Sequence, residues 1–109
     1  MEKLIHYRAA IQTVLNDLKY PSDANSQVLL DAERGHFQLL FSGLDAQGTY
    51  SFRVRVHIQL YDNGRVYLLE NRTETDIAEE LLKQGVAATD IVLAFLPQHV
   101  RQFSGYAVA

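Results

Sequence analysis

Apolar and polar side chains alternate from residue 49 to residue 61, and this run constrains the fold more than any other feature of the chain. A period of two indicates a β-strand, because successive side chains point to opposite faces of a sheet. One face carries Tyr50, Phe52, Val54, Val56, Ile58 and Leu60, and the other carries Ser51, Arg53, Arg55, His57 and Gln59. The pattern predicts an antiparallel sheet with one face in the core and the other toward water.

Three further strand-like segments and three turns accompany this run. The segments are residues 27–33, 36–43 and 65–71, and the turns are Arg34-Gly35, residues 45–48 and Asn63-Gly64. Asn-Gly favours a type I′ hairpin turn, since both residues tolerate a positive φ. Because consecutive strands joined by short turns are usually neighbours, we predict a four-stranded antiparallel meander.

Helical periodicity marks both ends of the chain. Residues 3–19 place apolar side chains three and four positions apart, and Pro21 with the polar residues after it is expected to end that helix. A second helix is expected with Thr73 or Thr75 as N-cap, Asp76 in its first turn, a buried face of Ile77, Ala78, Leu81 and Leu82, and Gly85 at C′. A third is expected to start at Thr89-Asp90, to use Ile91, Val92 and Phe95 as its apolar side and to stop at Pro97, with residues 99–103 adding one turn. The predicted class is α+β, a single domain over residues 1–109, with the C-terminal helices packed on one face of the meander.

The turns also predict which residues face one another across the sheet. Two-residue loops at Arg34-Gly35 and Asn63-Gly64 make Glu33 face His36 and Asp62 face Arg65. A middle turn symmetric about Ala46-Gln47 makes Phe37 face Val56, Leu39 face Val54 and Phe41 face Phe52, so that apolar meets apolar. The same register predicts two polar rows on the opposite face, one of Glu33, His36, His57 and Glu70 and one of Asp31, Gln38, Arg55 and Arg72.

Three interpretations of this polar face stay open. It is a solvated surface with cross-strand ion pairs, a docking surface for a partner protein, or a metal site formed by His36, His57 and either Glu33 or Glu70. Ser51 and Ser104 lack the Gly-x-Ser-x-Gly surroundings of a nucleophile, and the chain has no glycine-rich phosphate loop. We therefore expect no catalytic residue, no metal and no cofactor. The aromatic residues Phe37, Phe41 and Phe52 are assigned to the core rather than to a base-stacking platform.

Composition narrows the function classes. The chain has no cysteine, which excludes a disulfide, a thiolate metal site and a cysteine nucleophile. Its net charge is −3 at pH 7, so it lacks the overall basic surplus that unaided binding to duplex DNA uses. The first residues contain no apolar signal region and no apolar run has the length of a membrane span, so we expect a cytoplasmic protein without a membrane partner.

Residues along the whole chain resemble the XisI-like family of small cyanobacterial proteins. The resemblance is carried by Leu4, His6-Tyr7-Arg8, Asp31, Glu33-Arg34, His36-Phe37-Gln38-Leu39-Leu40, His57-Ile58, Gly64, Thr73-Glu74, Ile77-Ala78, Leu81, Gly85-Val86, Asp90-Ile91-Val92-Leu93, Phe95, Pro97, Arg101 and Ala107-Val108-Ala109. The chain departs from the family pattern at Leu44, Asn71 and Ala87.

The resemblance implies a regulatory role rather than a catalytic one. The family takes its name from a controlling factor in excision of the fdxN DNA element, and it is commonly paired with nuclease-like XisH proteins. We therefore expect a non-enzymatic accessory protein in DNA recombination that binds an XisH-like protein, touches DNA only indirectly and forms a homo-oligomer as a further option. The residues predicted to bind the partner are Asp31, Glu33, His36, Gln38, Arg53, Arg55, His57, Glu70 and Arg72. The alternatives are a direct DNA-binding excision factor, which needs Arg53, Arg55, Arg65 and Arg72 on one face, and a small metal-dependent hydrolase.

Overall fold

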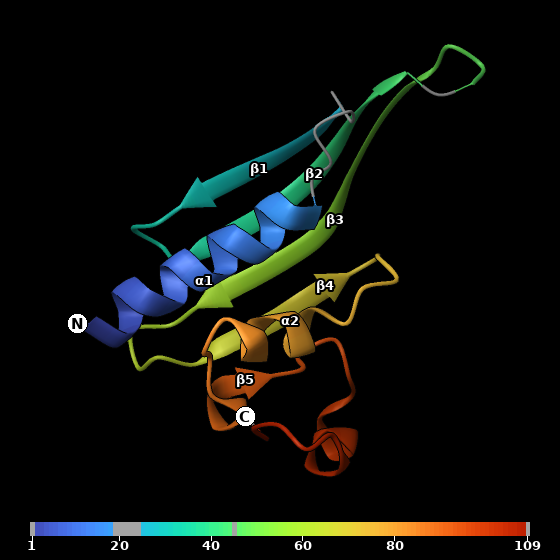
Figure 1. The fold of residues 1–109 in the computed structure, drawn as a ribbon. Coiled ribbons are helices and arrows are strands. Elements are labelled where there is room, and N and C mark those ends of the chain that lie inside the picture. Colours follow the sequence, from blue (N-terminus) through green and yellow to red (C-terminus); the bar gives the residue numbers. More distant parts are fainter. Residues whose placement is uncertain (1, 19–24, 45, 109) are drawn as a thin grey trace.

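The computed structural model describes residues 2–18, 25–44 and 46–108. Its elements are α1 (Glu2–Leu18), β1 (Ser26–Asp31), β2 (His36–Leu44), β3 (Tyr50–Leu60), β4 (Val66–Asn71), α2 (Ile77–Lys83), the 3₁₀ turn η1 (Ala88–Asp90), β5 (Ile91–Val92) and the 3₁₀ turn η2 (Gln98–Phe103). The strands form one sheet in the order β1-β2-β3-β4-β5 (Figure 1). β1 to β4 pair antiparallel in sequence order, which confirms the predicted meander. Among the described residues, no helix has both the length and the apolar character needed to cross a membrane.

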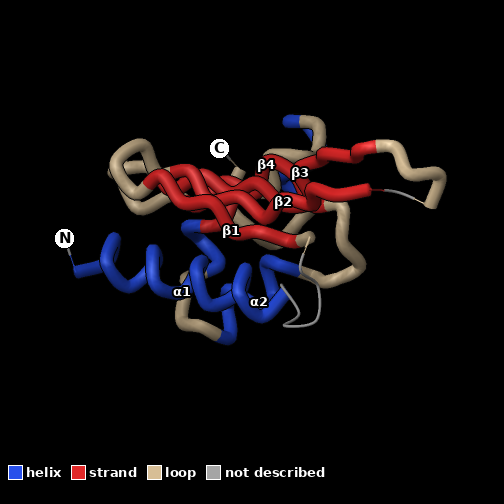
Figure 2. Tube along the Cα trace, turned by 90° about the horizontal axis from the view of Figure 1, so that it is seen from above, coloured by secondary structure: helices blue, strands red, loops and turns tan. Residues whose placement is uncertain are grey.

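The core lies between the sheet and the two α-helices. Figure 2 shows α1 and α2 on the same side of the sheet. The apolar stripe of α1 is confirmed, and its buried members are Tyr7, Ala10, Ile11, Val14 and Leu15. They pack with side chains from the covered face of the sheet, among them Phe37, Leu39, Val56, Ile58, Val66 and Leu68. The predicted end of this helix at Pro21 lies outside the described residues.

The helix α2 begins one residue later than predicted and ends as predicted. Its N-cap is Asp76, whose carboxylate accepts the N–H of Glu79 at 3.2 Å, so Thr73 and Thr75 are not the cap. Gly85 has φ +92° and donates its N–H to Leu82, while the N–H of Val86 bonds the carbonyl of Leu81. This pair of bonds is the Schellman arrangement that a glycine at C′ permits. Leu82, predicted as buried, is exposed.

The third predicted helix is wrong. Residues 88–90 form only a 3₁₀ turn, and Ile91 and Val92 form β5, which pairs in parallel with Val66 and Tyr67 of β4. Both β5 residues are fully buried, and their β-branched side chains suit a strand. A parallel pair needs a crossover, and α2 supplies it. Phe95 is exposed, and the turn expected at residues 99–103 is confirmed as η2.

The register between β2 and β3 differs from the prediction. Near the tip of the hairpin Leu44 faces Tyr50 and Phe41 faces Arg53, and a register shift follows between Leu39 and Leu40. Beyond it Leu39 faces Val56 and Phe37 faces Ile58, two residues from the predicted pairs. A displacement by two keeps each side chain on its face, so the core pairs stay apolar, whereas a displacement by one does not.

This register and the length of the hairpin remove two aromatic residues from the core. Phe41 is only half-buried, and Phe52 is 61% exposed. Phe41 faces Arg53 and Phe52 faces Ser42, so the two rings lie on opposite faces, and Phe52 is on the face that the α-helices do not cover. Figure 1 shows that β2 and β3 extend past the end of α1 as a projecting arm, which leaves this part of the helix-side face open as well. The predicted core role holds for Phe37 alone, which is fully buried.

The loops at Arg34-Gly35 and Asn63-Gly64 are both longer than the predicted two residues. Asp31 faces His36, so residues 32–35 form the first loop, and Gly35 has φ +76° with its N–H bonded to the carbonyl of Asp31. In the second, the N–H of Tyr61 bonds the carbonyl of Arg65, and Gly64 alone has a positive φ. A type I′ turn needs positive φ at both central residues, so that prediction is wrong. The facing pairs predicted at these loops, Glu33 with His36 and Asp62 with Arg65, are wrong for the same reason.

A polar cluster connects the N-terminal helix to the C-terminal third of the chain. The hydroxyl of Tyr7 donates to a carboxylate oxygen of Asp90 at 2.5 Å and accepts the N–H of Ala87 at 3.1 Å. The ammonium of Lys3 lies 2.9 Å from the same oxygen of Asp90. Burial first, and then the bond to Asp90, raise the pKa of Tyr7. Burial alone would raise the pKa of Asp90, but the bonds from Tyr7 and Lys3 hold it below its ordinary value of 3.8. The cluster fixes η1 against α1 across more than 80 residues of sequence.

Candidate functional site

The structure separates the predicted polar residues into two groups that do not share one face of the sheet, because Arg53 faces Phe41, which alternates with the buried Phe37 and Leu39 on β2. The first, here named the histidine patch, comprises Asp31, His36, Gln38, His57 and Glu70. The second, here named the arginine cavity, is lined by Phe41, Arg53, Arg55 and Arg72. Glu33 belongs to neither, because it lies exposed in the loop between β1 and β2.

The histidine patch is built by neighbouring residues on four strands, β1 to β4. Gln38 faces His57, and His57 faces Glu70, while Asp31 faces His36. The neighbouring residues Phe37, Val56 and Ile58 are in the core, so the alternation of the strands turns the patch away from the helices. The predicted pairing of His57 with Glu70 is confirmed. The predicted facing of His36 with His57 and of Gln38 with Arg55 is wrong, because the β2–β3 register differs and His36 faces Gln59.

The two histidines are in hydrogen-bond contact. Nδ1 of His36 lies 3.0 Å from Nε2 of His57. One nitrogen of this pair has to donate and the other to accept, so the contact cannot survive protonation of both rings. Burial first, and then the nearby His36, lower the pKa of His57 from its ordinary 6.5, while Glu70 opposes the shift. His57 is therefore disposed to remain uncharged at neutral pH.

Asp31 is held by the turn that follows it. Its two carboxylate oxygens accept the backbone N–H of Arg34 at 3.1 Å and the Arg34 guanidinium at 3.2 Å. The backbone bond first, and then the guanidinium, lower the pKa of Asp31. The carboxylate is thus already paired on the surface, and this pairing offers no reason to expect it to act as a proton acceptor in catalysis.

The patch lacks the ligand set of a metal site. Within the part of the chain that the structure describes, no three His, Cys, Asp or Glu side chains lie close enough to hold a metal ion. The predicted zinc alternative counted on Glu33 or Glu70 as a third ligand. Glu33 lies in the β1–β2 loop, and Glu70 accepts a hydrogen bond from Nε of Arg72 at 3.1 Å.

Two leucines next to the patch were not recognised from the sequence. Leu29 and Leu30 are 45% and 43% exposed, and with Asp31, His36 and Gln38 they line an open cavity of about 430 Å³. They lie on β1, which is an edge strand because among the described residues it pairs with β2 and with no other strand. Adjacent strand residues point to opposite faces, so a pair of consecutive leucines had already indicated one apolar side chain on the outer face.

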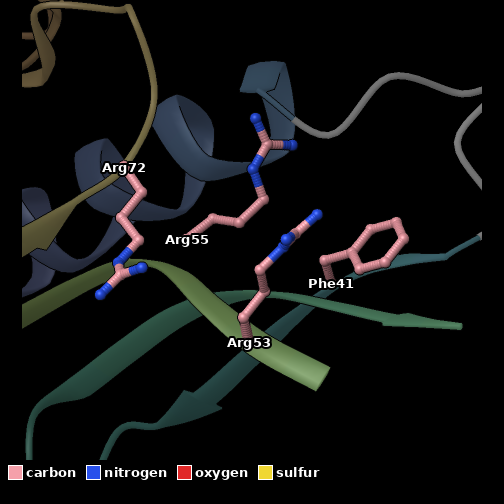
Figure 3. A pocket seen from close by; sticks show the side chains of 4 residues that line it. All are labelled: Phe41, Arg53, Arg55 and Arg72. Atoms are coloured by element: carbon pink, nitrogen blue, oxygen red, sulfur yellow. The ribbon is translucent and has the colours of Figure 1, made fainter. Parts of the chain in front are cut away.

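The arginine cavity is an open space of about 380 Å³. Figure 3 shows Arg53 and Arg55 extending from β3, with the ring of Phe41 beside the Arg53 guanidinium. The guanidinium carbon of Arg53 lies 5.0 Å from the centroid of that ring, within the range of a cation–π interaction. Arg72 joins from the end of β4, where its N–H bonds the carbonyl of Arg55 at 2.7 Å. The predicted pairing of Arg55 with Arg72 is thereby confirmed, and the contribution of Phe41 is new.

The fold and these surfaces define a small α+β domain with a mixed five-stranded sheet, two α-helices on one face and two polar surfaces. A family model for the XisI protein matches residues 1–108, so the chain belongs to the XisI family. A comparison with curated proteins gives no match.

Two solved structures from Anabaena variabilis share the fold. One is described as an XisI-like protein; it is 31% identical, the match covers 97% of this chain and 99% of that one, and the TM-score is 0.84. The other is described as the fdxN element excision controlling factor XisI; it is 26% identical, covers 98% of this chain and 99% of that one, and has a TM-score of 0.81. The resemblance read from the sequence is confirmed.

Proposed function

We propose that this chain is a non-catalytic accessory protein that takes part in excision of a DNA element by binding a nuclease-like XisH-type protein. Support comes from the family to which the chain belongs, since a solved relative is described as an excision controlling factor. An XisH-type partner was expected from the same resemblance and remains part of the proposal.

The observation that carries the proposal is the exposed pair of leucines beside the histidine patch. Protein interfaces commonly combine an apolar centre with a polar rim, and Leu29 and Leu30 with Asp31, His36 and Gln38 offer that combination in one cavity. The strand β1 also has an unpaired edge, to which an extended segment of a partner can add as a further strand. A long edge strand with apolar side chains is usually avoided unless it is covered.

The charges around this surface suit a protein partner better than a duplex. Acidic and basic groups are interleaved, with Asp31 beside Arg34 and Glu70 beside Arg72. Each carboxylate repels the phosphates of DNA, whereas neighbouring charges of opposite sign fix the register of a protein interface.

Direct binding of duplex DNA is the second candidate function, and the positions of the arginines in this chain favour it only in part. Arg53, Arg55 and Arg72 line one cavity, as that candidate requires. Arg65 lines a different cavity with Thr89 and residues 105–108. The four arginines therefore do not share one cavity.

Co-expression with an XisH-type protein tests the proposal. The tagged partner is expected to retain the wild-type chain, and Leu29→Glu is expected to lose this retention. Ile5→Glu is the matched control, because Ile5 is an exposed apolar residue on α1 and should not affect retention. Equal retention of both variants would contradict the assigned surface, and no retention of the wild type would contradict the partner. A second copy of this chain as the occupant would appear instead as a dimer that Leu29→Glu dissociates.

A further inference from the structure

The arginine cavity concentrates positive charge in a chain whose net charge is negative. Three of its ten Lys and Arg residues line this one space, while the whole chain carries −3. Among the described residues, the one carboxylate with an ion pair to any of the three is Glu70, which contacts Nε of Arg72. Counting these four charges, the cavity keeps an excess of about two positive charges.

The arrangement of the three arginines is unfavourable unless an anion is present. Arg55 on β3 and Arg72 at the end of β4 lie opposite each other, joined by the backbone hydrogen bond of 2.7 Å. Like charges directly opposite each other in a sheet repel and destabilise it. Figure 3 shows the two guanidinium groups extending in different directions, and an anion bound in the cavity would compensate this excess of positive charge.

The size of the charge excess favours phosphate over carboxylate. A guanidinium offers two parallel N–H donors that match the oxygens of a phosphate, and a phosphate monoester carries close to two negative charges at neutral pH. A single carboxylate carries one charge and would leave part of the excess uncompensated. The cavity of about 380 Å³ is also within the range of small-ligand sites.

The aromatic ring at the cavity indicates what is attached to the phosphate. Phe41 was expected in the core, but it is half-buried at the cavity with Arg53 beside its ring. Aromatic rings and guanidinium planes both stack on nucleobases, and such stacking tolerates any base. N–H donors for a phosphate, placed beside an aromatic ring on which a base can stack, match one nucleotide unit.

We infer that the arginine cavity binds a nucleotide unit, with its phosphate on the guanidinium groups that line the cavity and its base against Phe41 and Arg53. The same chemistry is offered by a free mononucleotide, and by single-stranded DNA in which two neighbouring phosphodiesters, each with one negative charge, supply the same total charge. Duplex DNA does not offer it, because its bases are stacked and paired. Nucleotide binding does not depend on the proposed partner surface, which is formed by Leu29, Leu30 and the histidine patch.

Binding of the purified chain to four probes tests this inference. Titration calorimetry would compare AMP with adenosine, which lacks the phosphate, and fluorescence anisotropy would compare labelled single-stranded dT10 with labelled hexaglutamate. AMP or dT10 is expected to bind, while adenosine and hexaglutamate are not. Binding of AMP but not dT10 would identify a free nucleotide as the ligand, and the reverse would identify a single strand. With at most three arginines engaged, log K for dT10 should fall against log salt with a slope no steeper than about −2.

Variants assign the binding to the cavity. Arg55→Gln is expected to weaken binding at least tenfold, and Phe41→Leu is expected to weaken AMP or dT10 while leaving inorganic phosphate unaffected. Arg34→Gln is the matched control, because Arg34 is an exposed arginine in the β1–β2 loop, away from the cavity lining. Unchanged binding by Arg55→Gln, binding of hexaglutamate alone, or no binding of either AMP or dT10 would each overturn the inference. Circular dichroism of each variant confirms that a lost signal does not come from lost folding.

Discussion

Tyr7→Phe tests the connection between the first helix and the C-terminal third of the chain. Tyr7 is 4% exposed, so phenylalanine fills the same space and only the hydroxyl is removed. That hydroxyl donates to Asp90 at 2.5 Å and accepts the N–H of Ala87 at 3.1 Å. A hydrogen bond to a charged group contributes about 1.5–3 kcal/mol. Lys3 keeps its contact with Asp90, and Ala87 is exposed enough for water to reach its N–H, so the lower part of that range applies.

We therefore expect Tyr7→Phe to reduce the free energy of unfolding by about 1.5–2 kcal/mol. For a domain of this size that loss lowers the melting temperature by roughly 6–9 °C. Urea unfolding at pH 7 measures the first quantity and thermal circular dichroism the second. Tyr61→Phe is the matched control: Tyr61 is an exposed tyrosine at the β3–β4 turn, and its substitution should cost under about 0.5 kcal/mol. If the two variants melted at the same temperature, the cluster would contribute nothing to stability and the reasoning would be refuted.

Three further predictions concern the sheet, its histidines and its charge. Val56→Asp should prevent folding or cost several kcal/mol, because Val56 is fully buried and its carboxylate would have no partner in the core. Arg55→Ala should change stability by well under about 1 kcal/mol, and thermal melts that gave equal losses for both variants would show that the face assignment is wrong. The pKa of His57 is lowered in the folded chain, so as the pH falls the unfolded chain takes up a proton on this histidine first. The contribution of His57 to the free energy of unfolding is therefore present above pH 6.5 and declines as the pH falls. Urea unfolding at pH 7 and pH 5 should show a smaller decline for His57→Gln than for the wild type; an equal decline would exclude His57, with its neighbours His36 and Glu70, as the source. The purified chain should bind duplex DNA weakly at physiological salt because of its net charge of −3, and a gel shift with nanomolar affinity for one duplex at about 150 mM salt would contradict this.

The sequence by itself determined the elements whose signal is local. Alternation over residues 49–61 and helical spacing over residues 3–19 are set by which side chains must leave water, and both elements formed as predicted. Gly85 also ended its helix as expected, since the left-handed conformation there needs only the residue itself. The family resemblance belongs to the same group, because it depends on the order and spacing of residues alone.

The tertiary structure decided what depends on partners distant in sequence. Thr89 to Val92 reads as a helix start, but Ile91 and Val92 became a strand because β4 presented an edge for them to pair with. The register of β2 and β3 depended on a shift between Leu39 and Leu40 that no local pattern marks.

The candidate sites follow the same division. The polar character of the sheet surface was readable from alternation, but its separation into a histidine patch and an arginine cavity was not. That separation arises because the register shift between Leu39 and Leu40 places Phe41 opposite Arg53 and Phe52 on the other face, and because the β2–β3 arm extends past α1. Whether a side chain is buried depends on the residues that pack over it. For Phe41 and Phe52 those residues would be distant in sequence, so only the folded chain decides their burial.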